Sequence, residues 1–209
     1  TSEAVIRSIY KGLERIGFKG GRVLEPGMGI GHFAGLLPWR STYTGIEMDS
    51  ITAKIAQYLY PKHHVKSEDF TKTVLPDNFF DLSVGNPPFA STVILSDPAF
   101  KKNRFKLHEY FIAKSLAKTK PGGLAVFISS RYAMDKVEGK FRDYVAERAD
   151  LLGAIRLPQT AFKQNAGTEV VTDVMFFRKR LPGEQPSGQA WQKLKEIQTD
   201  EGPVNINEY

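Results

Sequence analysis

The hydrophobic positions along the chain follow two alternating patterns. Apolar side chains at helical spacing predict helices, and short apolar runs bounded by glycine, proline or asparagine predict strands. The predicted helices cover residues 2–16, 31–37, 49–59, 104–119 and most of 131–148. The predicted strands cover residues 22–25, 42–46, 63–65, 79–84, 124–129, 151–157 and 170–177. Strands that alternate with helices indicate an α/β fold with a doubly wound, mostly parallel sheet of seven strands.

The end of the chain departs from this alternation. No convincing helical pattern separates the last two predicted strands, so we expect one antiparallel strand near the C-terminal edge of the sheet. Residues 181–209 are richer in Pro, Gly, Gln and Glu than the residues before them. We therefore expect residues 1–180 to form the folded domain and residues 181–209 to form a tail or linker.

Composition excludes several kinds of protein. The 209 residues suffice for one domain with a sizeable core, and they include no cysteine. Disulfides, thiolate zinc sites and cysteine nucleophiles are thus excluded, and so is cytosine-C5 methylation, which needs a cysteine.

His63 and His64 lack companion ligands, so we expect no metal site. No apolar run approaches the roughly 20 residues of a membrane span and no signal peptide is evident, so we expect a cytoplasmic protein without a membrane partner.

The formal net charge of +6 favours a polyanionic partner. The positive charges cluster at Lys101, Lys102, Arg104 and Lys106, and again at Lys114, Lys118 and Lys120. A solvated helix face explains such clusters equally well on charge alone. The charge therefore supports a nucleic-acid partner only together with the motifs nearby.

A glycine-rich turn follows the first predicted strand, over residues 24–33. Glycines at alternate positions let the backbone turn tightly and approach a ligand at the carboxyl edge of the sheet. The spacing is G-x-G-x-G rather than the G-x-G-x-x-G of dinucleotide sites, and Glu25 precedes the first glycine. A carboxylate there opposes a pyrophosphate but suits the amino acid end of S-adenosyl-L-methionine. A purely structural turn is the alternative.

Two acidic residues follow the next two strands. Glu47 ends the second predicted strand, where a carboxylate can accept hydrogen bonds from both ribose hydroxyls. Asp69 follows the third strand, and its carboxylate can accept from an adenine amino group while Phe70 packs against the ring. With the glycine turn, these residues predict a nucleoside-binding site.

The tetrapeptide Asn86-Pro87-Pro88-Phe89 ends the fourth strand beside the same edge. The exocyclic amine of adenine is a poor nucleophile because its lone pair is delocalised into the ring. The Asn86 side-chain oxygen and the Pro87 carbonyl can each accept one N–H, which localises that lone pair for attack on a sulfonium methyl group. The prolines stiffen the loop, and Phe89 can stack on a base flipped out of the duplex. A turn that only terminates a strand is the alternative.

These motifs resemble those of the N6-adenine DNA amino-methyltransferases with an N-P-P-F motif, above all the methylase region of large phage- and plasmid-borne helicase–methylase proteins. The resemblance covers residues 1–180 and implies a Rossmann-like class I methyltransferase domain, as in restriction-modification systems. It implies catalytic roles for Asn86, Pro87, Pro88 and Phe89, and S-adenosyl-L-methionine as cofactor. The cofactor-binding residues that it implies are Thr1, Glu25, Pro26, Gly27, Gly29, Phe33, Glu47, Met48, Asp69, Phe70 and Asn86. Residues 152–158 and Phe162 resemble a late motif that helps to hold the flipped base.

Two departures from the family pattern stand out. The usual motif begins with Asp and has a small residue before its second glycine, whereas this chain has Glu25 and Met28. No stretch is long enough for a target recognition domain of the usual size. Sequence specificity is therefore expected to come from a partner or from further chain, such as a helicase domain, or to be absent. The alternatives are methylation of protein glutamine or of RNA guanine amino groups, and a catalytically silent nucleic-acid-binding homologue. A nicotinamide oxidoreductase leaves the tetrapeptide unexplained.

Overall fold

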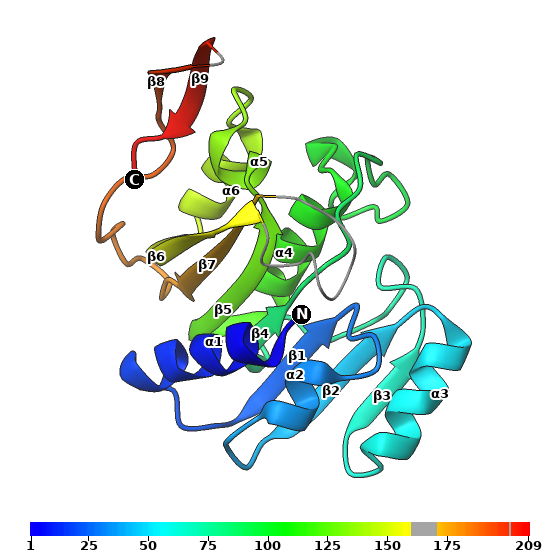
Figure 1. Cartoon of the computed structure of the whole chain (residues 1–209). Coiled ribbons are helices and arrows are strands. Elements are labelled where there is room, and N and C mark those ends of the chain that lie inside the picture. Colours follow the sequence, from blue (N-terminus) through cyan, green and yellow to red (C-terminus); the bar gives the residue numbers. More distant parts are fainter. Residues whose placement is uncertain (160–170, 201) are drawn as a thin grey trace.

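The computed structural model describes residues 1–159, 171–200 and 202–209, and its main feature is a seven-stranded sheet (Figure 1). The strand order is β3-β2-β1-β4-β5-β7-β6. The strands are β1 (Arg22–Pro26), β2 (Thr42–Glu47), β3 (His64–Ser67), β4 (Phe80–Gly85), β5 (Thr119–Ser130), β6 (Ala149–Leu157) and β7 (Thr172–Lys179). Only β7 runs antiparallel to its neighbours β5 and β6. The predicted sheet, with its single antiparallel strand near the C-terminal edge, is confirmed.

Helices cover both faces of this sheet (Figure 1). They are α1 (Glu3–Arg15), α2 (His32–Leu36), α3 (Ser50–Leu59), α4 (Leu107–Lys118), α5 (Tyr132–Asp135) and α6 (Lys140–Ala146), with a short 3-10 helix η1 (Lys101–Asn103) before α4. One core cluster joins α1 and α2 to one face of the sheet, and a second cluster joins α4, α5 and α6 to the opposite face. The apolar periodicity in the sequence thus marks the faces that are buried.

The segment between β4 and α4 differs from its prediction. The helix expected over residues 104–119 begins only at Leu107. The residues before it pair with the chain that leaves β4: the Ile94 amide donates to the Phe105 carbonyl at 2.9 Å, and the Leu107 amide donates to the Thr92 carbonyl at 2.9 Å. Arg104, with a φ of 55°, adopts a left-handed conformation that no helix interior allows. The apolar Phe105 continues the helical pattern although it lies before the first residue of α4.

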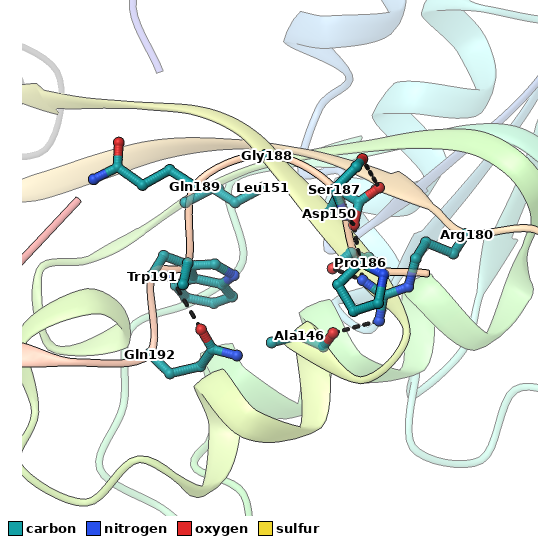
Figure 2. Close-up of a pocket in the computed structure, with 12 residues that line it drawn as sticks. Ala146, Asp150, Leu151, Arg180, Pro186, Ser187, Gly188, Gln189, Trp191 and Gln192 are labelled. Atoms are coloured by element: carbon teal, nitrogen blue, oxygen red, sulfur yellow. Dashed lines mark hydrogen bonds and ion pairs between the residues drawn. The ribbon is translucent and has the colours of Figure 1, made fainter. Parts of the chain in front are cut away.

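Residues 186–192 lie against β6 at the edge of the sheet. The chain then forms a hairpin of β8 (Leu194–Thr199) and β9 (Gly202–Asn207), which projects away from the sheet (Figure 1) and is tied to α5 by the Asn207 amide, which donates to Asp135 at 3.0 Å. Trp191 is buried and packs against Phe177 with ring centroids 5.7 Å apart. Figure 2 shows Asp150 beneath this segment, where it accepts hydrogen bonds from the Ser187 amide at 3.1 Å and the Ser187 hydroxyl at 2.8 Å. The role of this segment as a link to a further domain stays a prediction.

Among the described residues, no helix combines the length and apolar character needed to cross a bilayer.

Candidate active site at the carboxyl edge of the sheet

A cavity of about 400 Å³ lies where β1, β2 and β4 end, beside the first turn of α4. It is lined by Gly27, Gly29, Ile46, Glu47, Met48, Glu68, Asp69, Phe70, Thr71, Asn86, Pro88, Leu107 and Phe111. Parallel strands bring their carboxyl ends to one edge, so residues from the glycine turn, the two acidic positions and the N-P-P-F loop meet here. The structure thus brings together most of the residues singled out in the sequence.

The glycine turn is held by the end of β2. The amides of Gly27 and Met28 both donate to the Ile46 carbonyl, at 2.8 and 3.0 Å. Gly27 and Gly29 have φ values of 68° and 58°, a region that other residues rarely adopt. A Cβ atom on Gly27 would also lie 3.3 Å from the Phe111 ring. These glycines let bare backbone form one wall of the cavity.

Met28, the bulky residue in this turn, is accommodated by β2. Its side chain is buried, and its sulfur occupies the space that a Cβ atom on Gly45 would need, since the two would lie only 2.0 Å apart. The missing side chain in β2 therefore compensates for the large residue in the turn. This departure from the usual motif leaves the path of the glycine turn intact.

Glu47 lies at the tip of β2 and lines the cavity. One carboxylate oxygen accepts from the Gly29 amide at 2.9 Å, and the other accepts from the Asp49 amide at 2.9 Å. A carboxylate oxygen can accept more than one hydrogen bond. Glu47 therefore fixes the glycine turn and retains acceptor capacity toward the cavity.

Asp69 and Phe70 form a wall of the same cavity, after β3. Asp69 accepts from the Thr71 amide at 2.8 Å, which fixes the turn that carries it. Phe70 is buried, and its ring centroid lies 4.9 Å from that of Phe111. The buried ammonium group of Lys114 donates to the Phe70 carbonyl at 2.7 Å. This wall is therefore anchored to α4.

Asn86 lies between the cavity and Thr1. Its Nδ2 donates to the Thr1 hydroxyl oxygen at 3.1 Å. Its Oδ1 is buried and, within the part of the chain that the structure describes, has no hydrogen-bond partner. A buried polar atom without a partner costs roughly 1–3 kcal/mol, so the fold maintains an unsatisfied acceptor at this position.

The other residues of the N-P-P-F loop differ in exposure. Pro87 is buried, whereas Pro88 lines the cavity. Phe89 is 37% exposed, whereas phenylalanine side chains are more often buried. Its ring meets His108 edge to face, with centroids 6.4 Å apart. Phe89 is thus available for contact with a molecule outside the fold.

Four residues expected to contact the cofactor are not among those that line the cavity. Thr1 contacts Asn86 instead. Glu25 and Pro26 are buried behind the glycine turn at the end of β1. Phe33 is buried in the core cluster on the opposite face of the sheet, with α1, and its carbonyl accepts from the Tyr10 hydroxyl at 2.6 Å. Direct contact of these side chains with a cofactor stays a prediction, and Phe162 lies outside the described residues.

Glu25 is a buried acid with a shifted pKa. Burial raises the pKa of its carboxyl from 4.5 to about 8, although the hydroxyl of Tyr43, which donates to it, acts in the opposite direction. The folded state therefore retains a proton that the unfolded chain loses above its ordinary pKa. Glu25 makes the fold less stable as the pH rises from about 4.5 to about 8.

We therefore expect Glu25→Gln to reduce the loss of stability between pH 5 and pH 8. Urea unfolding at pH 5 and at pH 8 gives the decrease in unfolding free energy between the two pH values. This decrease should be smaller in Glu25→Gln than in the unaltered protein by more than about 1.4 kcal/mol, the equivalent of one pKa unit. Glu14→Gln, an exposed position on α1, is the matched control. Parallel pH profiles for Glu25→Gln and the unaltered protein would show that the carboxyl is ionised in the fold.

Sequence reasoning missed some residues of the cavity wall. Leu107 and Phe111 belong to the helix predicted over residues 104–119, and helical spacing does not distinguish a core contact from a cavity wall. Glu68 and Thr71 flank the Asp69-Phe70 pair, and no motif in the sequence marks them as residues of the cavity wall. Within the described residues, no group of three or more histidine, aspartate or glutamate side chains is arranged to hold a metal ion.

Comparison with known proteins is consistent with this geometry. The family model described as Eco57I restriction-modification methylase matches residues 41–162. The chain is 30% identical over 185 residues to defense against restriction protein B of Escherichia phage P1, a match that covers 86% of this chain and 8% of the phage protein. It is 28% identical over 175 residues to the type II methyltransferase M.CvrRI of Paramecium bursaria Chlorella virus XZ-6E, which covers 79% of this chain and 44% of that protein. The chain thus spans less than half the length of these relatives.

A solved structure from Listeria monocytogenes, described as a candidate class I S-adenosylmethionine-dependent methyltransferase, superimposes with a TM-score of 0.76. The match covers 91% of this chain and 64% of that one, at 17% identity. This likeness establishes the class I methyltransferase fold. The family match includes β2, the acidic positions and the N-P-P-F loop. The chain belongs to the Eco57I restriction-modification methylase family.

Proposed function

We propose that this protein transfers a methyl group from S-adenosyl-L-methionine to the N6 amino group of adenine in DNA. The observation that carries the proposal is the buried Oδ1 of Asn86 beside the cavity, an acceptor for which the described part of the chain supplies no partner. An amino group that enters from the solvent side would satisfy this atom. Family membership supports methyl transfer in a restriction-modification setting, and the choice of adenine N6 is our inference from the loop.

The cavity fits the proposed cofactor in size and chemistry. Its 400 Å³ lie within the range of about 300–1,000 Å³ that small-molecule sites usually occupy. We assign Glu47 to the ribose hydroxyls, Asp69 to the adenine amino group and the Phe70 region to the adenine ring. The backbone at Gly27 and Gly29 would face the amino acid end, where no side chain intervenes. When bound, the cofactor supplies a methyl carbon made electrophilic by the positive sulfonium.

The protein's own contribution is to orient the target amine. Asn86 Oδ1 would accept one N–H and the Pro87 carbonyl the other, which draws the nitrogen lone pair out of conjugation with the ring. The hydrogen bond from Asn86 Nδ2 to Thr1 fixes the amide so that its oxygen is the atom left to accept. The exposed Phe89 would stack on the flipped base. No strong base is needed, because the proton can leave after transfer.

DNA and a further protein component are the proposed partners. The phage and algal-virus relatives are much longer than this chain, so residues outside the matched part are available in them for target recognition. We propose that such a part, or a separate subunit or helicase domain, supplies sequence specificity here too. We propose that the protein acts in the cytoplasm, where DNA is accessible in a bacterial host.

Incubation with methyl-labelled S-adenosyl-L-methionine and separate DNA, RNA and protein acceptors tests the proposal. Label should enter DNA and stay at background in RNA and protein. Binding of the cofactor is measured in parallel by calorimetry. Label in protein or RNA would replace the proposal with one of those acceptors, and cofactor binding without transfer to any acceptor would identify a catalytically silent homologue.

A further inference from the structure

The segment between β4 and α4 forms an ordered projection at the edge of the cavity. Residues 92–107, here called the 92–107 excursion, leave the N-P-P-F loop and return to the first turn of α4. Val93 and Lys106 form an antiparallel bridge, so the two ends of the excursion are held together. Leu107 at its base lines the cavity. The excursion and the target amine would therefore share one side of the molecule.

Buried side chains anchor this excursion to α4. Asp97 is buried, receives a hydrogen bond from the Tyr110 hydroxyl at 2.7 Å and forms an ion pair with Lys114 at 3.0 Å. Phe100 and Phe105 are buried in the core cluster on the same face. Asp97, Phe100 and Phe105 thus fix the excursion to the domain. Asp97 is the one acidic residue in the excursion, and Lys114 neutralises its charge.

The tip of the excursion carries only positive charge. Lys101, Lys102 and Arg104 are exposed there, and η1 together with the left-handed Arg104 sets their spacing. None of them takes part in an ion pair within the described part of the chain. Many other basic side chains of this protein, Lys114 and Lys118 among them, are paired with carboxylates. Three unpaired cations on a rigid support suit a string of phosphates.

We infer that the 92–107 excursion binds the DNA backbone beside the target adenine through Lys101, Lys102 and Arg104. This inference rests on the proposed function for the identity of the nucleic acid. The excursion is continuous with the N-P-P-F loop, so phosphate contacts at its tip would set the distance between the backbone and Asn86. Such contacts position the DNA strand without reading its sequence. They would allow this domain to engage DNA before a separate component supplies specificity.

Binding of a fluorescent DNA duplex at several salt concentrations tests the inference. The variant Lys101→Gln/Lys102→Gln/Arg104→Gln removes the three charges. It should bind about 10- to 100-fold more weakly at low salt, and the slope of log affinity against log salt should become shallower by roughly 2–3, since each lost phosphate contact removes about 0.9. Cofactor affinity should remain unchanged, which also shows that the variant is folded.

The matched control is Lys11→Gln/Arg15→Gln/Lys19→Gln. These residues are also exposed and also carry three positive charges, but they lie toward the end of α1 and before β1, at the opposite edge of the sheet. The control should keep the original affinity and slope. The inference would be overturned if all three proteins had the same slope of log affinity against log salt. It would also be overturned if both variants lost the same amount of DNA affinity.

The two proposals fail separately. Methylation of adenine by the unaltered protein with no effect of the 101/102/104 variant would refute the phosphate surface alone. A salt slope that depends on these three residues, without methyl transfer to DNA, would refute the proposed reaction alone. A duplex that does not bind the unaltered protein at any salt concentration would refute the phosphate surface directly.

Discussion

Asn86→Ala is expected to abolish detectable methyl transfer, a loss of roughly 1,000-fold or more, while cofactor affinity changes little. The substitution removes a buried amide oxygen beside the cavity that has no hydrogen-bond partner among the described residues. Removing a single aimed dipole from an active site typically costs about 100- to 1,000-fold in rate, and here the same dipole also orients the nucleophile. Single-turnover transfer of labelled methyl groups to DNA measures the rate, and calorimetry measures cofactor binding.

Two further variants sharpen this experiment. Asn205→Ala truncates an exposed asparagine on β9, remote from the cavity, and should leave the rate unchanged. Asn86→Asp keeps an acceptor oxygen at the same position and should retain more activity than the alanine variant. An alanine variant as active as the unaltered protein would remove Asn86 from the reaction. A comparable loss of cofactor affinity would instead assign Asn86 mainly to cofactor binding.

Glu47→Ala is expected to weaken cofactor binding by about 100-fold. Two hydrogen bonds from ribose hydroxyls to a carboxylate are together worth about 3 kcal/mol or more, and the loss also releases the Gly29 amide that Glu47 now holds at 2.9 Å. Calorimetric titration with S-adenosyl-L-methionine measures the change. Methyl transfer at saturating cofactor should be affected far less than affinity.

The control for this prediction separates the two roles of Glu47. Glu47→Gln keeps an acceptor for the Gly29 amide but removes the negative charge, so its affinity should lie between those of the alanine variant and the unaltered protein. Glu14→Ala, on the exposed face of α1, should bind normally. Unchanged affinity in Glu47→Ala would exclude Glu47 from the ribose site.

The sequence predicted the fold well because its signals were local. Period-3.6 and continuous apolar runs predict helices and strands, and their alternation leaves few topologies. The site followed from the same logic: the glycine turn, Glu47, Asp69 and Asn86 each come directly after a strand, and parallel strands place such positions at one edge. The sequence therefore predicted that these residues lie close together, although it gave none of the distances between them.

Features that depend on tertiary contacts were beyond this reasoning. Phe33 lies only four residues after Gly29, yet the first turn of α2 directs it into the core cluster that includes α1. The 92–107 excursion is held by the pairing of Asp97 with Lys114, two residues that lie 17 positions apart in the sequence. Trp191 and Asp150 dock a segment whose composition resembles a linker. Each of these outcomes depends on a partner that no short window of sequence contains.

The exchange between Met28 and Gly45 illustrates the same limit. In the sequence Met28 is a departure from the usual small residue, and Gly45 is an unremarkable glycine within a strand. In the fold the two are complementary, because the methionine sulfur fills the space above the glycine. A motif can thus tolerate a large residue when a neighbouring strand provides the volume.

Identification of the methylated nucleoside tests the central claim most directly. Genomic DNA that lacks adenine methylation is incubated with the protein and methyl-labelled S-adenosyl-L-methionine, digested to nucleosides and resolved by mass spectrometry. The label should be found in N6-methyldeoxyadenosine and be absent in the Asn86→Ala reaction. Label in a methylated cytosine, or equal N6-methyldeoxyadenosine with Asn86→Ala, would contradict the proposal that Asn86 presents the adenine amino group for methylation.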